Sequence, residues 1–341
     1  MLKPTDKLTL FMHEALTEGV GKMGHGILRY SDNPVACVID RSQAGKRVCD
    51  VTDIDSDAPI VATIEEALAY DPDVMVLGIA PPGGLIPEQW FTEIDFAVEK
   101  GLSLMNGLHN LLEDRYPNLP DGQWVWDIRT EPEGIGVGYG EARHLTNQRV
   151  LLIGTDMAVG KMTAGLEIVK QAKAAGVDAE FVATGQVGIA ITGKGIPLDR
   201  IRIDFAAGAV EDAVLKADAE MVIVEGQGSL LHPGSSSTLP LMRGSQPTEL
   251  LLCHRAGMDT LPKVPWIKVP PLPDVIKLFE DVCAACGTFR PAPVVGVALN
   301  TAHLDANTAN DEGKKLEDEL QLPVCDPVRD GAGKLLNALQ R

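Results

Sequence analysis

Apolar runs alternate with helix-like stretches along the first half of the chain. The sequence predicts strands at LTLFMHEA, PVACVIDRS, PIVA, DVMVLGIA and LSLMNG, and helices at TIEEALAYD and WFTEIDFAVEKG. Strands that alternate with helices are typical of a parallel α/β sheet. A PPGG loop at residues 81–84 follows one of these strands, at the sheet edge where α/β proteins place their ligand crevices.

A second alternation begins at Val150. The sequence predicts strands at VLLI, AEFVAT, EMVIVEGQGS, ELLLCHRAG and PVVGVALNT, and helices near DFAAGAVEDAVLKA and residues 273–286, with GQVGIAITGKGIP as a loop. Residues 117–148, rich in Gly, Pro and polar side chains, separate the two halves. Because 341 residues are too many for one ordinary core, we predict two α/β domains, residues 1–145 and 146–341.

A glycine-rich segment follows the first strand of the second half. Residues 154–163 read GTDMAVGKMT and precede the helix-compatible AGLEIVKQAKAAG. In this order of strand, loop and helix, the amides of residues 158–161 point into one concavity and Lys161 adds a full charge. The segment predicts a phosphate-binding loop for a triphosphate, a diphosphate or the tail of coenzyme A. It is one residue longer than G-x-x-x-x-G-K-[ST], with Met162 in the usual Ser or Thr position and Thr163 one place later.

Three polar residues are candidates for chemistry. Glu225 ends the apolar run Val222–Val224, as the carboxylate of a Walker B strand does, although it could instead cap the next turn. Asp156 could contact substrate or magnesium, or cap the loop through its side chain. His232 follows in the EGQGSLLHPGSSS loop and is either a general base or a turn partner.

Two further motifs have weaker support. Gly19, Gly21 and Gly24 have G-x-G-x-x-G spacing, and Asp40 stands where a ribose-binding acid would follow. The preceding HEALTE is a poor buried strand, so the motif lacks the context of a dinucleotide site, and a glycine-rich loop is the simpler interpretation. Cys283 and Cys286 form a lone C-x-x-C without the second pair that zinc requires, so we expect no metal there.

The composition narrows the possible partners. With a net charge of −18 and no basic face in its sequence, the chain is not expected to bind nucleic acid. A local cradle of backbone amides and one lysine can still bind an anion. No apolar run is long enough for a membrane span, and MLKPTDKLTL lacks a signal-peptide core, so we expect a cytoplasmic protein without a membrane partner. The six scattered cysteines suit reduced thiols.

Longer stretches of the chain resemble a known family. GTDMAVGKMT, ATGQVGIAITGKGIPLD, DFAAGAVE and VIVEGQGSLLHPGSSS resemble a phosphate-loop family, formerly of unknown function, that includes D-glutamate N-acetyltransferases. GHGILRYS, APPGG and NGLHNLLEDRYP resemble its Rossmann-like N-terminal domain. The G-T-D-x-x-x-G-K core, EGQGS and VALNT are also similar to dethiobiotin synthetase, where Asn300 corresponds to a base-reading asparagine.

The resemblance implies a Rossmann-like domain followed by a P-loop NTPase-like catalytic domain with a mostly parallel sheet. It also implies transfer of the acetyl group of acetyl-CoA to the amine of D-glutamate. Coenzyme A carries a 3′-phosphorylated ADP, so a nucleotide site can hold its phosphates without a metal. The implied contacts are Gly154, Thr155, Ala158, Val159, Gly160, Lys161, Met162 and Thr163 for the phosphates, and Asn300 for the adenine.

Acetyl transfer requires a proton acceptor, donors for the oxyanion and groups that bind a dicarboxylate. Asp156, Glu225 or His232 could accept the ammonium proton, and amides of residues 185–188 or 226–229 could bind the oxyanion. The candidates for the substrate are Gln186, Lys194, Ser235, Ser236 and Arg243, although Arg243 could equally form a surface ion pair.

Two other functions remain open from the sequence. One is an ATP-dependent ligase or kinase of the dethiobiotin synthetase type, with magnesium held through Thr163, Asp156 and Glu225 beside Lys161. The other is a nucleotide-binding regulator that performs no chemistry. In each case we expect a small-molecule ligand and a homo-oligomer.

Overall fold

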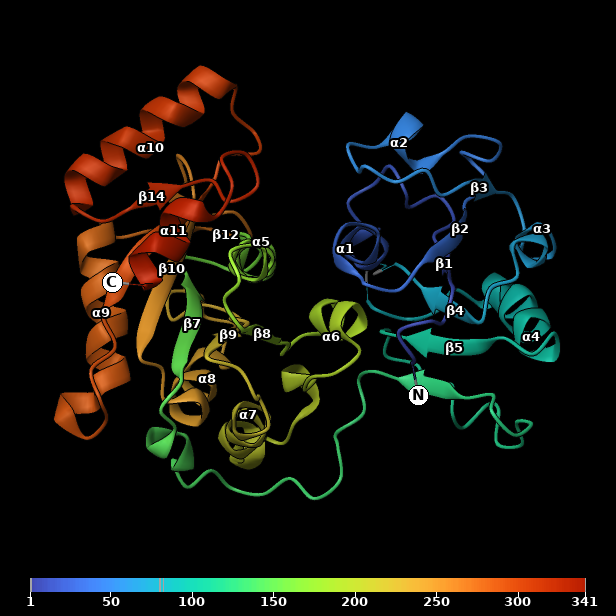
Figure 1. Ribbon diagram of the computed structural model, residues 1–341, viewed down its shortest axis with the longest axis horizontal. Helices are drawn as coiled ribbons and strands as arrows, with labels where there is room; N and C mark the ends of the chain where they lie inside the picture. The colour runs from blue at the N-terminus through green and yellow to red at the C-terminus, as the bar shows by residue number, and fades with distance from the viewer. Residues whose placement is uncertain (1, 80, 82, 341) are drawn as a thin grey trace. The chain divides into compact units, whose positions relative to one another are not determined.

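The computed structural model describes residues 2–79, 81 and 83–340, and the chain forms two compact α/β units (Figure 1). The first unit contains Met1–Glu131 and Gln186–Arg200, and the second contains Pro132–Gly185 and Ile201–Arg341. The fold class predicted from the sequence is confirmed. The division differs from the expected boundary at residue 145 in two ways: it comes after Glu131, and the segment 186–200 belongs to the first unit.

The first unit is built on a six-stranded parallel sheet in the order β3-β2-β1-β4-β5-β6, the strand order of dinucleotide-binding folds. Its strands are β1 (Leu8–Phe11), β2 (Val35–Ile39), β3 (Ile60–Val61), β4 (Val74–Leu77), β5 (Ser103–Asn106) and β6 (Val125–Asp127). Its helices are α1 (Lys22–Tyr30), α2 (Val48–Val51), α3 (Ile64–Ala67), α4 (Phe91–Glu99) and α6 (Gln186–Thr192). Helices α1 and α6 pack together on one face, and α3 and α4 lie on the other (Figure 1).

Helix α6 forms where the sequence predicted a loop. GQVGIAIT combines glycines with β-branched residues, both weak helix formers. Val187 and Ile191, one helical turn apart, pack against Gly26 of α1, where an added Cβ would lie 2.9–3.0 Å from their side chains. Tertiary packing therefore overrides the local propensity. It also explains why residues 186–200 group with the first unit.

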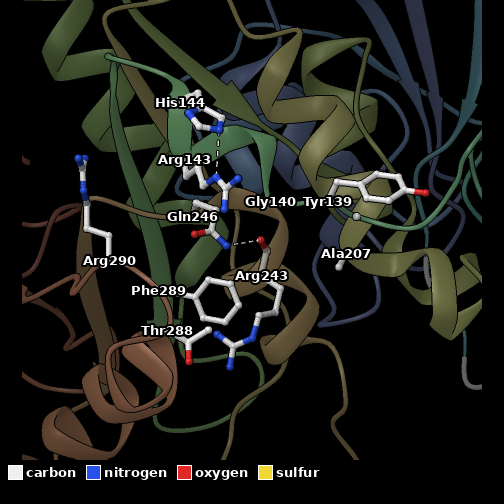
Figure 2. Close-up of a pocket in the computed structure, with 11 residues that line it drawn as sticks. Tyr139, Gly140, Arg143, His144, Ala207, Arg243, Gln246, Thr288, Phe289 and Arg290 are labelled. Carbon is white, nitrogen blue, oxygen red and sulfur yellow. Dashed lines mark hydrogen bonds between the residues drawn. The ribbon is translucent and has the colours of Figure 1, made fainter.

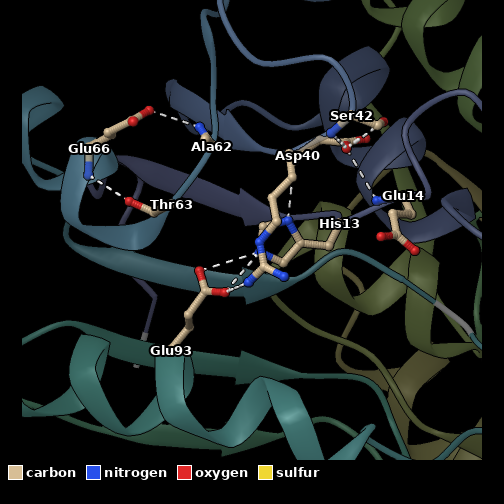
Figure 3. A network of polar contacts seen from close by, with 9 residues as sticks. His13, Glu14, Asp40, Ser42, Ala62, Thr63, Glu66 and Glu93 are labelled. Carbon is tan, nitrogen blue, oxygen red and sulfur yellow. Dashed lines mark hydrogen bonds and ion pairs between the residues drawn. The ribbon is translucent and has the colours of Figure 1, made fainter.

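The glycine-rich segment near the N-terminus is not a dinucleotide fingerprint. β1 ends at Phe11 and α1 begins at Lys22, so residues 12–21 form a long connection rather than a tight strand-to-helix turn. Asp40, which follows β2, accepts a hydrogen bond from the amide of Glu14 at 3.2 Å (Figure 3) and another from the amide of Leu16 at 3.3 Å. Its Oδ1 also accepts from the amide and hydroxyl of Ser42. Asp40 therefore fastens this connection, and its oxygens are used within the protein.

A network of polar contacts stabilises the same edge of the first sheet. His13 Nε2 lies 3.1 Å from Glu93 Oε1, and the Arg41 guanidinium contacts the same carboxylate (Figure 3). The Arg41 amide donates to His13 Nδ1, so the proton on Nε2 points at Glu93. This network ties α4 to the ends of β1 and β2. Ala80 and Pro82 of the expected APPGG loop lie outside the described residues.

The second unit contains another six-stranded parallel sheet, in the order β14-β13-β10-β7-β9-β8. Its strands are β7 (Gln148–Gly154), β8 (Ala179–Val182), β9 (Met221–Val224), β10 (Glu249–Arg255), β13 (Val294–Asn300) and β14 (Val324–Cys325). β11 (Thr260–Leu261) and β12 (Val264–Lys268) form a separate antiparallel hairpin. The central strands β7, β9 and β10 are almost entirely buried, as expected for a parallel sheet covered on both faces.

Six of the described helices cover this sheet. They are α5 (Lys161–Ala174), α7 (Ala206–Leu215), α8 (Thr238–Ser245), α9 (Leu272–Ala284), α10 (Ala306–Leu320) and α11 (Gly333–Leu339). α5 and α11 pack together on one face, while α7 and α8 pack together on the opposite face (Figure 1). Among the described helices, none has the length and apolar character needed to cross a lipid bilayer.

Candidate functional site

The phosphate loop lies between β7 and α5, as the sequence predicted. Ala158 and Gly160 have positive φ values of 56° and 109°, which turn the backbone before α5 begins at Lys161. The Asp156 carboxylate accepts the Met157 amide at 2.7 Å and so stabilises the loop from within. In the described part of the chain, no acceptor is placed for the amides of Ala158, Val159 and Gly160. These donors and the N-terminus of α5 form a cradle for an anion.

Lys161 lies within this cradle. Its side chain is buried, and Nζ donates to the carbonyl oxygen of Asp156 at 2.8 Å. Burial lowers the pKa of Lys161, and the carboxylates of Asp156 and Glu225 act in the opposite direction. A bound phosphate would accept further hydrogen bonds from the ammonium group of Lys161, which the loop already holds in place.

Glu225 follows β9 and is buried at the same sheet edge. Its Oε2 accepts the amides of Thr184 and Gly185, which follow β8, at 2.8 and 3.1 Å. Burial raises the pKa of Glu225 to about 7, although the two amides and Lys161 favour its charged form. Glu225 therefore changes its protonation state near neutral pH, which suits a group that takes up and releases a proton.

Gly226 sets the close spacing between Glu225 and the phosphate loop. A Cβ at Gly226 would collide with the carbonyl oxygen of Leu152 and lie 2.7 Å from Cδ of Lys161. Only glycine allows this backbone to pass so near β7 and the lysine. Among the described residues, no acceptor is placed for the amides of Gly226, Gln227 and Gly228, and these amides are candidates for binding an oxyanion.

The rest of the EGQGSLLHPGSSS loop is held by its own side chains. Ser235 Oγ accepts the Ser229 amide at 3.0 Å, and Ser229 Oγ accepts the Leu231 amide at 3.1 Å. His232 Nδ1 accepts the Gly234 amide at 3.0 Å, so the neutral ring carries its proton on Nε2. Nε2 is buried and has no hydrogen-bond partner among the described residues. His232 can therefore donate a hydrogen bond through Nε2, and its contact with the Gly234 amide matches the turn partner, one of the two roles that the sequence left open.

Two residues beside the phosphate loop come from neighbouring strands. Asn300, at the end of β13, donates from Nδ2 to the carbonyl oxygen of Val159 at 3.4 Å. His254, in β10, lies 3.0 Å from Thr155 Oγ1 through Nδ1, and burial lowers its pKa to about 4, so it is neutral. His254 was not among the residues expected at the site. Its position near the end of a central strand beside β7 was the available signal, since carboxyl ends of parallel strands share one edge.

The structure brings together some of the predicted site residues and not others. Gly154, Thr155, Asp156, Ala158, Val159, Gly160, Lys161, Met162, Thr163, Glu225, Asn300, His232, Ser235 and Ser236 belong to the second unit, on or after strands that end at the edge of the phosphate loop. Gln186 and Lys194 belong to the first unit, in α6 and just after it. Gln186 packs against Gly107 there.

Arg243 lies at the opposite edge of the second sheet. It is in α8, whose last residue Ser245 accepts a hydrogen bond through its carbonyl from Arg149 at the start of β7. The phosphate loop follows the other end of β7, about 17 Å away by the rise of a strand. Arg243 donates to the carbonyls of Val282 and Cys283 in α9, so the structure does not bring it to the phosphate loop.

Two domain families match the chain. Residues 41–131 match a Rossmann-like domain of unknown function, DUF1611_N, and residues 136–336 match a P-loop domain of unknown function, DUF1611_C. A solved crystal structure of a DUF1611 family protein from Anabaena variabilis is 47% identical to this chain, with a TM-score of 0.93 over 98% of this chain and 99% of that one.

Two relatives have names that refer to an activity. A protein of Tritonibacter scottomollicae named D-glutamate N-acetyltransferase is 36% identical over 81% of this chain and 84% of its own. A protein of a Pseudoalteromonas species with the same name is 31% identical over 97% of this chain and 95% of its own. The chain belongs to the DUF1611 family, with a Rossmann-like domain followed by a P-loop domain.

Proposed function

We propose that the protein is an N-acetyltransferase that moves the acetyl group of acetyl-CoA to the amine of D-glutamate. The observation that carries the proposal is the pairing of an anion cradle with a buried carboxyl group, Glu225, whose pKa is about 7. The names of the two relatives supply the acceptor and the reaction class.

The cradle supports binding of the cosubstrate through its phosphates. Coenzyme A carries a diphosphate and a 3′-phosphate, and the amides of Ala158, Val159 and Gly160 with Lys161 supply donors for one of these groups. Asn300 borders the same loop and is the proposed contact for the adenine. The acetyl thioester is then expected beyond the diphosphate, on the side of Glu225.

Glu225 is the proposed proton acceptor. The amine of an amino acid is protonated at neutral pH, so it must lose a proton before it can act as a nucleophile. Ionised Glu225 takes that proton directly or through a water. The amine nitrogen then attacks the carbonyl carbon of the thioester, a C–N bond forms and the C–S bond breaks. The nitrogen gives up its second proton to the departing thiolate, so coenzyme A leaves as the free thiol.

Hydrogen-bond donors near Glu225 support the transition state. The carbonyl oxygen becomes an oxyanion when nitrogen attacks, and the amides of Gly226, Gln227 and Gly228 are the proposed donors. Nε2–H of His232 is a further donor, for this oxyanion or for a carboxylate of the acceptor. Ser235 and Ser236 of the second unit remain proposed contacts for the acceptor.

Release of free thiol from acetyl-CoA tests the proposal. Purified protein is compared with D-glutamate, L-glutamate or no amino acid, with and without magnesium, and with Lys161→Ala as control. We expect release of free thiol that depends on D-glutamate, is independent of magnesium and is lost in Lys161→Ala. Absence of release with every amino acid, together with magnesium-dependent ATP binding, would instead support the ligase or kinase.

A further inference from the structure

A cavity rich in arginine lies at the amino edge of the second sheet, away from the phosphate loop. It has a volume of about 710 Å³, within the size range of small-molecule sites. Arg143, His144, Arg243 and Arg290 line it (Figure 2). None of its described lining residues is an aspartate or a glutamate.

Among the described residues, the arginines of this cavity have no acidic partner. In the described part of the chain, Arg143, Arg243 and Arg290 form no ion pair, whereas Arg29, Arg47 and Arg115 of the first unit each pair with an aspartate. The chain has 48 acidic and 30 basic residues and is therefore negatively charged overall. Arginines without acidic partners, gathered in one concave site, give this cavity the opposite sign of charge. Such a grouping is expected where an anion is bound.

A buried arginine adds to the positive charge beneath the cavity. Arg149 is 0% exposed, and its guanidinium donates to backbone carbonyls of Leu145, Asn147, Ser245 and Gln246. Gln246 is itself part of the cavity wall. Glu249 is the acidic residue whose charge acts on Arg149, and it lies outside the cavity lining.

The walls that carry the arginines are fixed in place. The Glu211 carboxylate, in α7, accepts the amides of Tyr139 and Glu141 at 3.0 and 2.9 Å and so holds one rim of the cavity. Arg243 lies 4.4 Å from the ring centre of Phe289 and binds the last turn of α9, so it positions the opposite wall. Arg143 and Arg290 are exposed and extend from these two walls (Figure 2).

We propose that this cavity is a second anion site, which binds a small molecule carrying two or more phosphate charges through Arg143 and Arg290. Several uncompensated cations require a multiply charged ligand, and guanidinium groups match phosphate oxygens in two-point contacts. The concave shape and the two exposed side chains favour a small ligand over a flat protein surface. The exposed Tyr139 ring at the rim offers an apolar contact for the remainder of that ligand.

The site has a physical connection to the phosphate-loop edge. α8 ends beside the cavity at Ser245, and at its other end Thr238 Oγ1 donates to the carbonyl of Gln227 at 3.1 Å, two residues from Glu225. A ligand that shifts α8 would therefore reach the loop that carries Glu225. The binding proposal stands on its own and does not depend on the proposed acetyl transfer.

Calorimetric titration of the full chain with inorganic pyrophosphate tests the site. The titration uses the wild type, Lys161→Ala and the double variant Arg143→Gln/Arg290→Gln. The double variant Arg29→Gln/Arg47→Gln is the matched control, because it removes the same charge from exposed arginines of the first unit. Thermal melting of each variant checks that it is folded, and size-exclusion chromatography reports its oligomeric state.

We expect pyrophosphate to bind Lys161→Ala and the control variant Arg29→Gln/Arg47→Gln with the same affinity as it binds this cavity in the wild type. Loss of Arg143 and Arg290 should weaken that binding about a hundredfold, roughly tenfold for each charge-assisted contact. Binding that disappears in Lys161→Ala, or that is unchanged in Arg143→Gln/Arg290→Gln, would overturn the proposal. Citrate binding as tightly as pyrophosphate would refute the assignment to phosphate, and dissociation of an oligomer in the double variant would show that a second copy covers the cavity.

Discussion

Replacing Glu225 with glutamine tests two consequences of burying this carboxyl group: the pH dependence of the stability of the fold, and the capacity of the group to accept a proton. The pKa of Glu225 rises from its ordinary value of 4.5 to about 7 because burial disfavours the charge. The folded state therefore binds the proton more tightly than the unfolded chain. Protonated Glu225 stabilises the fold below pH 4.5, and this contribution is lost as the pH rises towards 7. At about 1.4 kcal/mol for each pKa unit, the full loss is about 3 kcal/mol.

Glu225→Gln should therefore be more stable than the wild type at pH 8 and similar to it near pH 4.5. Glutamine has the same shape, and its oxygen still accepts the amides of Thr184 and Gly185. Urea unfolding at pH 5, 6, 7 and 8 measures this difference in free energy, which should grow to about 3 kcal/mol. In the same variant, acetyl transfer should fall about 100-fold or more, because the proton acceptor is lost.

The wild-type rate supplies the matching test. With Glu225 as the proton acceptor, kcat/KM should rise as the pH passes through about 7 and should then level off. The control is Glu211→Gln, which changes another buried carboxylate that accepts two backbone amides, away from the phosphate loop. Full activity in Glu225→Gln, or a stability difference that does not vary with pH, would refute the reasoning.

Four further changes test the rest of the site. Lys161→Ala should weaken binding of coenzyme A about 10- to 100-fold in calorimetry, since charge-assisted contacts contribute about 1.5–3 kcal/mol; unchanged affinity would place the phosphates elsewhere. His232→Ala should lower kcat/KM about tenfold and leave the pH profile unchanged, because Nε2 donates rather than accepts; a shifted profile would restore His232 as the base. Gly226→Ala should lose about 1–3 kcal/mol of stability in urea unfolding because its Cβ meets the Leu152 carbonyl. Thr163→Ala should keep its affinity for coenzyme A, and a large loss accompanied by magnesium dependence would favour an ATP site.

The phosphate loop was predictable because its chemistry is local. The residue order of β7, loop and α5 fixes where the amides of residues 158–160 and Lys161 point, and the structure has this arrangement. Glu225 was predictable as the end of a buried strand. Its protonation near pH 7 was not, because that depends on burial and on the amides of Thr184 and Gly185, which follow a different strand.

Features that depend on tertiary contacts could not be predicted from the sequence. Helix α6 contains weak helix formers and owes its place to packing against Gly26. The role of His232 depends on the Gly234 amide, which selects one tautomer. Arg243 is close in sequence to the Ser235 region, but one turn and one helix carry it to the other edge of the sheet. Nearness along the chain is a poor guide where a helix runs from one edge to the other.

Transfer of a labelled acetyl group tests the central claim most directly. Acetyl-CoA labelled with ¹³C in the acetyl group is incubated with the protein and D-glutamate, and the products are identified by mass spectrometry. The account predicts labelled N-acetylglutamate and free coenzyme A in equal amounts, with both lost in Glu225→Gln. Label found only as free acetate, or no labelled product from D-glutamate, would contradict it.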